Sequence, residues 1–304
     1  MNVKRPFHFV SAGIIFLMLS VPSWSQIREP DIYPFAQTNT ILLKTAGAFN
    51  FDNDDFFDII GVASQIDAKG NHVPRSTYLV HLESTASGEL NILWKFAIPE
   101  NLNGDFTDVT VSDLDGDGSP EIAAVISISE IVSGVNPGSL YIFKYTDGFS
   151  KEPTAIINIA EKQSVRPRPL FIDAGDMNGD RKNDLVISSI GPGRGISIIC
   201  FNGQISENNT QILFQSSNLK VLLGFLQFRA VSADLDTFPG EDLLIFGGKK
   251  DLEIEVYRSD FNSTPVYFSS LKNINRSEID LAKIVWGDLD GDGFDEILIP
   301  LKNG

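Results

Sequence analysis

The chain has 304 residues and an acidic composition, with 40 Asp and Glu against 24 Lys and Arg and a net charge of −16. Hydrophobic residues make up 42% of the chain and charged residues 21%, a globular composition that excludes a largely disordered protein. The negative surface expected from this charge repels phosphates and anionic lipids, so we expect no nucleic acid partner, and it favours cations wherever the acids cluster.

The first 25 residues have the pattern of a secretory signal peptide. Lys4 and Arg5 form a positive start, an apolar run follows, and small residues precede a predicted cleavage site before Gln26. The alternative is a membrane anchor, but the apolar run is shorter than the roughly 20 residues that span a bilayer. We expect a mature chain of residues 26–304 with no integral membrane segment, located outside the cell, in the periplasm or on the cell surface.

Five acidic loops recur along the mature chain, at residues 50–58, 113–121, 176–184, 234–242 and 288–296. Their first residues are 63, 63, 58 and 54 positions apart, and this near-constant period indicates an internal repeat. Every loop has oxygen-bearing side chains at its first, third and ninth positions, and an aliphatic residue follows the ninth. Four of the five also have an acid at the fifth position.

Short runs rich in β-branched residues surround the loops, such as 108–112 before the second loop and 122–126 after it. Further runs of this kind follow within each period, at 139–144 and 252–257 for example. Each period therefore holds about four short strands, which is the unit of a β-propeller. The sequence predicts an all-β fold made of four-stranded blades.

The spacing of the acids suits Ca²⁺, which takes six to eight oxygen ligands at about 2.3–2.6 Å. Alternate side chains at positions one, three and five can point inward, and a carboxylate at position nine can close the shell. Glycines at the fourth or sixth position allow the backbone angles of such a turn. The alternative is that the loops are plain acidic turns, since Asp, Asn and Gly favour turns in any case.

Other metal sites fit less well. An EF-hand requires Glu at position twelve and flanking helices, whereas that position holds Ala124, Ile187 and Ile299 in predicted strands. Zinc prefers His and Cys, and the mature chain has only His72, His81 and Cys200. With one cysteine the chain can form no internal disulfide, so we expect the bound cations to be structural and to stabilise the exported fold.

The loops and their flanking strands resemble the FG-GAP/VCBS repeats, found in the N-terminal propeller of integrin α-subunits and in bacterial surface proteins. The resemblance covers residues 46 to 304 and implies a propeller, usually seven-bladed, with Ca²⁺ in the loops between the first two strands of a blade. It implies about four calcium sites and a fifth at 234–242 that is weak or empty, because Phe238 replaces the fifth ligand. The implied ligands are Asn50, Asp52, Asp54 and Asp58; Asp113, Asp115, Asp117 and Glu121; Asp176, Asn178, Asp180 and Asp184; Asp234, Asp236 and Asp242; and Asp288, Asp290, Asp292 and Glu296.

The number of blades is left open by the sequence. The mature chain holds fewer than five full periods, and it ends a few residues after the last loop. Either residues 31–45 close a five-bladed ring, or the reading frame is truncated and the five motifs belong to a larger ring. We favour truncation.

Two classes of function remain. The first is a binding, adhesion or scaffold module whose ligand is a protein or a glycan. The second is a polysaccharide-processing enzyme, a lyase or hydrolase, on a calcium-stabilised propeller. We favour the first, because the sequence shows no nucleophile motif and the loops account for the clustered carboxylates.

Overall fold

The computed structural model describes residues 39–52, 54–99, 104–128, 139–146, 148–159, 168–190, 196–203, 210–219, 228–247, 251–259, 267–275 and 278–301. The predicted signal peptide lies outside them. Within these ranges, no helix is long and apolar enough to cross a membrane.

The described strands form four antiparallel sheets of four strands and one sheet of two strands. In each four-stranded sheet, strands that follow one another in the chain pair with one another, which is the meander of a propeller blade. The prediction of an all-β propeller with four-stranded blades is therefore confirmed. Blade 1 comprises β1 (Thr40–Phe49), β2 (Asp58–Gln65), β3 (Tyr78–Ser84) and β4 (Leu90–Ala97). Blade 2 comprises β5 (Gly104–Ser112), β6 (Glu121–Ile128), β7 (Ser139–Lys144) and β8 (Ala155–Asn158).

The later blades repeat this plan. Blade 3 comprises β9 (Arg168–Gly175), β10 (Asp184–Ile190), β11 (Ile196–Phe201) and β12 (Ile212–Leu219). Blade 4 comprises β13 (Arg229–Ala233), β14 (Asp242–Gly247), β15 (Asp251–Tyr257) and β16 (Tyr267–Asn275). A 3₁₀ turn at Leu281–Lys283 leads into the fifth sheet, which comprises β17 (Val285–Gly287) and β18 (Glu296–Leu298).

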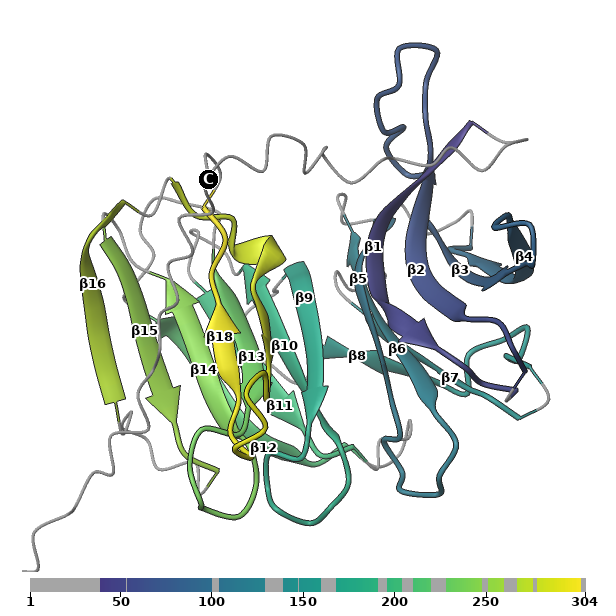
Figure 1. Cartoon of the computed structure of the whole chain (residues 1–304). Helices are drawn as coiled ribbons and strands as arrows, with labels where there is room; N and C mark the ends of the chain where they lie inside the picture. The colour runs from purple at the N-terminus through teal and green to yellow at the C-terminus, as the bar shows by residue number, and fades with distance from the viewer. Residues whose placement is uncertain are drawn as a thin grey trace, which may run out of the picture.

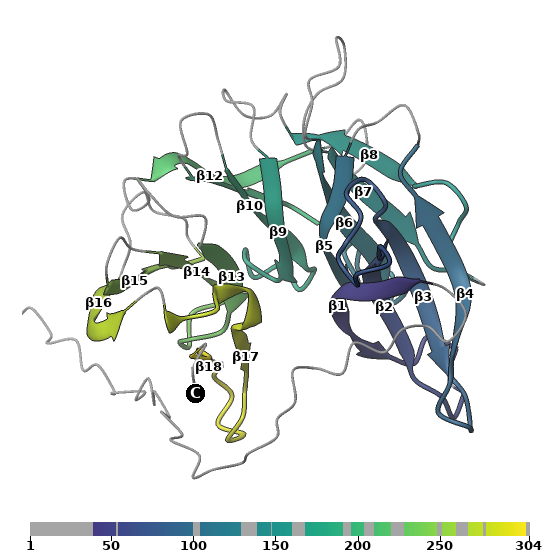
Figure 2. The same ribbon diagram turned by 90° about the horizontal axis from the view of Figure 1, so that it is seen from above.

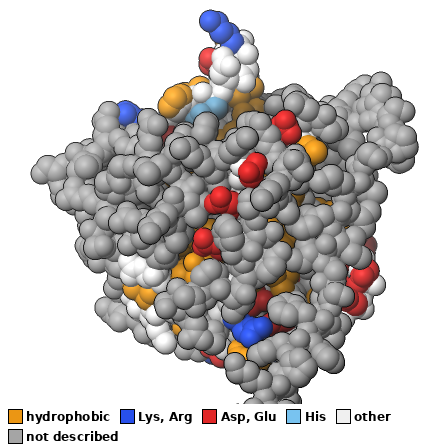
Figure 3. Space-filling view, turned by 90° about the vertical axis from the view of Figure 1, so that its left-hand side faces the viewer, with side chains coloured by type: hydrophobic (Ala, Val, Ile, Leu, Met, Phe, Trp, Pro, Cys, Tyr) orange, Lys and Arg blue, Asp and Glu red, His pale blue; other side chains and the backbone are white. Residues whose placement is uncertain are grey.

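The sheets stand side by side around a common centre (Figure 1). From above, the first strands β1, β5, β9, β13 and β17 lie toward the middle, and the fourth strands β4, β8, β12 and β16 lie toward the outside (Figure 2). On the side shown in Figure 3, the acidic side chains of the described residues are visible at several separate places.

Hydrophobic cores lie between neighbouring blades. Residues alternate along a strand between the two faces of its sheet, and β6 shows this clearly. Its residues Ile122, Ala124 and Ile126 pack in the core shared with blade 1, whereas Ala123 and Val125 pack in the core shared with blade 3. Both faces of the strand are therefore buried, which explains the continuous apolar run in the sequence.

The innermost strands place four side chains at one level of the propeller axis. These side chains occupy equivalent positions on the first strands of blades 1 to 4, because each pairs with the fifth residue of the second strand. They are Lys44, Asp108, Phe171 and Arg229. Lys44 Nζ lies 5.4 Å from the centre of the Phe171 ring, and Arg229 Cζ lies 5.9 Å from it. Burial raises the pKa of Asp108, and the positive charge of Lys44 opposes this shift. The described part of the axis thus carries charges of both signs.

Asp173, also on β9, gives a prediction about pH. Its Oδ2 accepts a hydrogen bond from the Ser232 N–H at 2.8 Å, and burial raises its pKa from 3.8 to about 7. Between about pH 4 and pH 7 the folded state holds a proton that the unfolded state has released, so the free energy of unfolding falls as pH rises. Asp173→Asn keeps an oxygen acceptor but does not titrate.

We therefore compare the free energy of unfolding of the wild type with that of Asp173→Asn. The wild-type value should fall, relative to the variant's, by about 1 kcal/mol for each pH unit over this range. The variant should be the more stable protein at alkaline pH. Urea titrations at several pH values, in the presence of a chelator, measure this difference. A difference that does not change with pH would contradict the prediction.

Candidate metal centre

Each acidic loop connects the first and second strands of its blade. The loops of blades 2, 3 and 4 extend side by side from the lower end in Figure 1. The loops are numbered here in chain order: loop 1 (50–58), loop 2 (113–121), loop 3 (176–184), loop 4 (234–242) and loop 5 (288–296).

The first residue of a loop organises its backbone. In loop 2, the Asp113 carboxylate accepts hydrogen bonds from the N–H groups of the fourth, fifth and sixth residues, at 2.8, 3.1 and 2.9 Å. The same three bonds recur at Asp176 in loop 3 and at Asp288 in loop 5. The turn is therefore shaped by the protein's own hydrogen bonds.

The sixth position of these loops requires a positive φ. Gly293 has φ +92° in loop 5, whereas the same position in loop 3 is Arg181, with φ +68°. A residue with a Cβ is strained in this region, so we expect Arg181→Gly to raise the free energy of unfolding by about 0.5–1 kcal/mol. The matched change Gly293→Ala meets no atom within 4 Å of its Cβ and should lower stability through φ alone. Urea unfolding of both variants measures this, and destabilisation by Arg181→Gly would contradict it.

The ninth residue closes the loop by reaching back to the second. The distances from its carboxylate to that backbone nitrogen are 2.7 Å for Asp58, 2.8 Å for Glu121, 3.1 Å for Asp184 and 2.8 Å for Glu296. The carboxylate is thereby held at the base of the loop, and in loops 2 and 5 it lies close to the carboxylates of the first and third residues.

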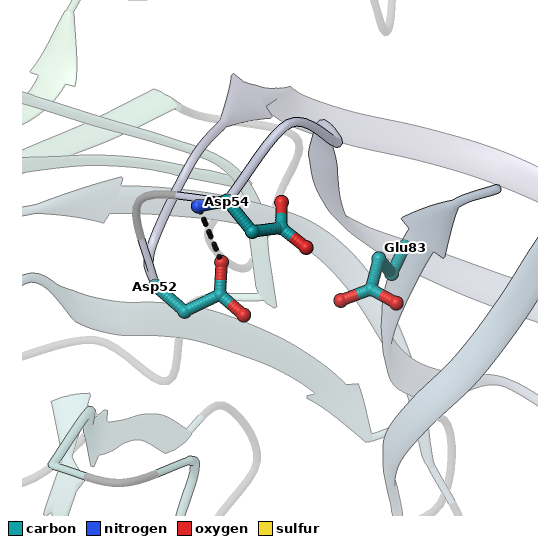
Figure 4. Close-up of side chains that lie close together, drawn as sticks. All are labelled: Asp52, Asp54 and Glu83. Atoms are coloured by element: carbon teal, nitrogen blue, oxygen red, sulfur yellow. Dashed lines mark hydrogen bonds between the residues drawn. The ribbon is translucent and has the colours of Figure 1, made fainter. Parts of the chain in front are cut away.

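Three groups of carboxylates in the described residues could hold a metal ion, each with ligand atoms within 4.8 Å of one another. Hard cations such as Ca²⁺ are bound by oxygens of this kind. Figure 4 shows the group of loop 1, in which the Asp54 and Glu83 carboxylates point toward one another and Asp52 lies beside them. The three groups are Asp52, Asp54 and Glu83; Asp113, Asp115 and Glu121; and Asp288, Asp290 and Glu296.

Glu121 provides the best test of whether loop 2 fits a cation. The residue is 4% exposed, and its Oε1 atom is buried without a hydrogen-bond partner. Burial raises its pKa to about 7, and the nearby Asp115 and Asp113 also raise it, while the Leu114 N–H and Lys144 act in the opposite direction. A buried carboxylate oxygen without a hydrogen bond is unfavourable, and a cation between the acids would satisfy it. The donor set therefore fits a calcium ion.

Loop 1 differs from the predicted ligand set. Both Asp58 oxygens have partners, since Oδ2 accepts from the Phe51 N–H and Oδ1 lies 2.6 Å from Nε2 of the buried His81. The carboxylate that faces Asp52 and Asp54 is instead Glu83, on β3. The Asn50 amide donates to the Asp54 carbonyl at 2.7 Å. A ligand role for Asn50 or Asp58 stays a prediction.

Sequence reasoning missed Glu83 because it lies outside the repeated motif. The signal that could have found it is strand register, since Asp58 pairs with Glu83 across β2 and β3. Burial raises the pKa of Glu83, and the neighbouring Asp54 and Asp52 raise it further. These charges repel one another, and a divalent cation would relieve the repulsion.

In loop 3 the predicted ligands are held by hydrogen bonds. Asp184 is fully buried, and its Oδ1 accepts from the Gly203 N–H at 3.0 Å. The Asn178 amide lies 3.5 Å from the same Asp184 oxygen, and Asp180 Oδ1 accepts from the Lys182 N–H at 3.0 Å. Burial raises the pKa of Asp184 to about 7. Their role as calcium ligands stays a prediction.

Loop 4 contains an arginine contact. Phe238, at the fifth position, is 44% exposed, and the Arg258 guanidinium lies 5.3 Å from the centre of its ring. Arg258 Nη2 also lies 2.9 Å from Asp236 Oδ2. Burial raises the pKa of Asp234, and Asp295 in loop 5 raises it as well. Asp236 is thus paired with a cation from within the chain. A weak or empty metal site formed by Asp234, Asp236 and Asp242 stays a prediction.

Neighbouring loops are joined through their eighth residues. The Glu241 N–H of loop 4 donates to the Asp176 carbonyl at 2.7 Å, and the Asp295 N–H of loop 5 donates to the Asp234 carbonyl at 2.7 Å. Asp295 Oδ2 also accepts from the Asp234 N–H at 2.9 Å. Hydrogen bonds therefore link loops 3, 4 and 5 into one continuous row.

Comparison with known proteins finds similar structures but no sequence match. No protein family matches the sequence, and no curated protein does. A rhamnogalacturonan lyase from Bacillus licheniformis is 15% identical, with a TM-score of 0.49, over 85% of this chain and 46% of that one. A fructofuranosidase from Schwanniomyces occidentalis is 12% identical, with a TM-score of 0.46, over 83% and 50%.

The β-propeller domain of Nup133 from Vanderwaltozyma polyspora is 13% identical, with a TM-score of 0.43, over 81% of this chain and 68% of that one. The chain spans about half the length of the lyase and of the fructofuranosidase. The assignment of the fold rests on the strand order of the blades themselves.

Proposed function

We propose that this chain is an exported calcium-binding β-propeller of the FG-GAP/VCBS type, which binds a protein or glycan ligand as an adhesion or scaffold module. The observation that carries the calcium part is the buried Glu121 Oε1, which has no hydrogen bond and faces the acids of loop 2. The pattern of the five loops supports the family, and the N-terminal 25 residues support export.

The residues that would hold the ions are the three carboxylate groups of loops 1, 2 and 5, together with backbone carbonyls of the same loops. A bound Ca²⁺ supplies positive charge that offsets the repulsion between these acids. The loops themselves provide the shape, through the first-position aspartates and the ninth-position carboxylates. Calcium is therefore expected to stiffen one face of the propeller rather than to take part in a reaction.

A binding role is supported by the row of loops 3, 4 and 5, which hydrogen bonds link to one another. Such loops on a stable sheet scaffold are the usual location of ligand contacts in proteins. The eighth-position contacts fix the loops relative to one another, which reduces the conformational entropy that ligand binding would otherwise remove.

Ser64 and His72 form a hydrogen-bonded pair of the kind that can serve as nucleophile and base. Ser64 Oγ lies 2.5 Å from His72 Nδ1, but Ser64 is fully buried and also contacts Ser76 Oγ at 2.9 Å. A nucleophile must reach its substrate. These contacts therefore support a structural role in the β2–β3 connection.

The experiment that tests this function has two parts. Isothermal titration of the metal-stripped protein with CaCl₂ tests calcium binding, and Asp290→Asn should remove the site in loop 5. Affinity electrophoresis through gels containing polysaccharides, with and without calcium, then tests glycan binding. The absorbance of unsaturated products is recorded with the same polysaccharides, and turnover would replace the binding proposal with the lyase alternative.

A further inference from the structure

One position, near the end of the third strand or directly after it, faces the acidic loop in each of blades 1 to 4. In blades 1 and 2 it is the residue that pairs with the ninth loop residue, and the pairs are Asp58 with Glu83 and Glu121 with Lys144. In blades 3 and 4 it follows directly after the last strand pair, opposite Asp184 and Asp242. We call it the facing position; its residues are Glu83, Lys144, Asn202 and Arg258.

The side chain at each facing position reaches the acids of its own loop. Lys144 Nζ lies 2.7 Å from Asp115 Oδ2 and also contacts Asp117. Arg258 pairs with Asp236 in loop 4. Asn202 Nδ2 lies 3.5 Å from Asp180 Oδ2 in loop 3. Glu83 adds a carboxylate to loop 1. The same place in the blade thus supplies a cation, a neutral amide or a further acid.

We propose that the residue at the facing position determines how each loop's acids are neutralised, and that Lys144 acts as a built-in cation that calcium must displace from loop 2. This inference rests on the proposed calcium binding and assigns its regulation. Loop 1, with Glu83, depends on an external cation. Loop 4 keeps Arg258.

The contacts of Lys144 fit a displaceable cation. Its ammonium touches the third and fifth loop residues but lies 3.8 Å from Glu121 Oε1, which receives no hydrogen bond. The side chain is 30% exposed and carries its charge on a flexible stem, so it can leave the loop. Because Lys144 contacts two acids of loop 2, it competes with calcium for them. A calcium ion, unlike the ammonium, can contact the first, third and ninth carboxylates together, since ligand atoms of Asp113, Asp115 and Glu121 lie within 4.8 Å of one another.

The test uses the full mature chain, stripped of metal with a chelator and titrated with CaCl₂ by calorimetry. Lys144→Met removes the ammonium and offers no ligand oxygen. We expect it to tighten calcium binding at one site by about two- to fivefold, because exposed ion pairs of this kind oppose displacement by a comparable factor. Without calcium the variant should melt at a lower temperature than the wild type, since the acids of loop 2 lose their counter-ion.

Three controls assign the effect. Lys151→Met removes an exposed lysine in the connection between β7 and β8, outside loop 2, and should leave calcium affinity unchanged. Lys144→Arg keeps the charge and should bind calcium as the wild type does. Adding Asp115→Asn to Lys144→Met should abolish the tightened site.

The outcomes separate this inference from the calcium proposal. If Asp290→Asn removes a calcium site but Lys144→Met leaves every affinity unchanged, the built-in cation is wrong and calcium binding stands. If neither the wild type nor any variant binds calcium, both are overturned.

Discussion

Removing divalent cations is expected to lower the melting temperature of the protein by about 10 °C, and adding CaCl₂ should restore it. A ligand that binds only the folded state adds about 2.7 kcal/mol at a hundred times its dissociation constant. Each kcal/mol shifts the melting temperature of a chain of this size by about 2–4 °C. Two occupied carboxylate groups are enough for the expected shift, and three are present in the described residues.

Differential scanning calorimetry with EDTA and with CaCl₂ measures this effect. MgCl₂ is the matched comparison, because Mg²⁺ keeps its waters and prefers fewer carboxylates, so it should restore less of the stability. The variant that combines Asp52→Asn with Asp290→Asn should lose most of the response to calcium. A melting temperature that EDTA leaves unchanged would contradict a structural role for calcium.

Phe143→Ala is expected to lower the free energy of unfolding by about 3–5 kcal/mol. Phe143 is fully buried between blades 1 and 2, and its ring centre lies 4.8 Å from that of Phe96 and 5.1 Å from that of Trp94. Truncation would remove these contacts and leave a cavity in the core that joins the two blades. Phe57→Ala is the matched control, because Phe57 is 65% exposed and its truncation should change stability by no more than about 0.5 kcal/mol. Similar losses for both variants in urea titrations would contradict the packing between blades.

The repeat made the fold predictable from the sequence. The regular spacing of the acidic loops and the short apolar runs around them indicate one blade per period, and the strand order confirms four-stranded blades. The continuous apolar run at 122–126 follows from packing on both faces of β6. The grouping of the acids within each loop could also be predicted from the sequence, because these residues lie close together in the chain.

The loop motif alone could not predict contacts between different strands. Glu83 and Lys144 come from a later strand, and their place opposite the loop depends on register, which the loop motif does not contain. The pairing of His81 with Asp58 has the same origin, and it occupies a carboxylate that the motif assigns to the metal. By their motif, loops 1, 2 and 4 are variants of one pattern. The residue at the facing position, which is Glu83, Lys144 or Arg258, gives the three loops different charges.

The most direct measurement is a crystal structure of the mature chain grown with CaCl₂, with anomalous scattering recorded at a wavelength where calcium contributes. We expect anomalous peaks among Asp52, Asp54 and Glu83 and among Asp288, Asp290 and Glu296. At loop 2 a peak should accompany movement of Lys144 away from Asp115. Loops without peaks at saturating calcium, with their acids arranged as they are here, would contradict the proposal that calcium is part of this fold.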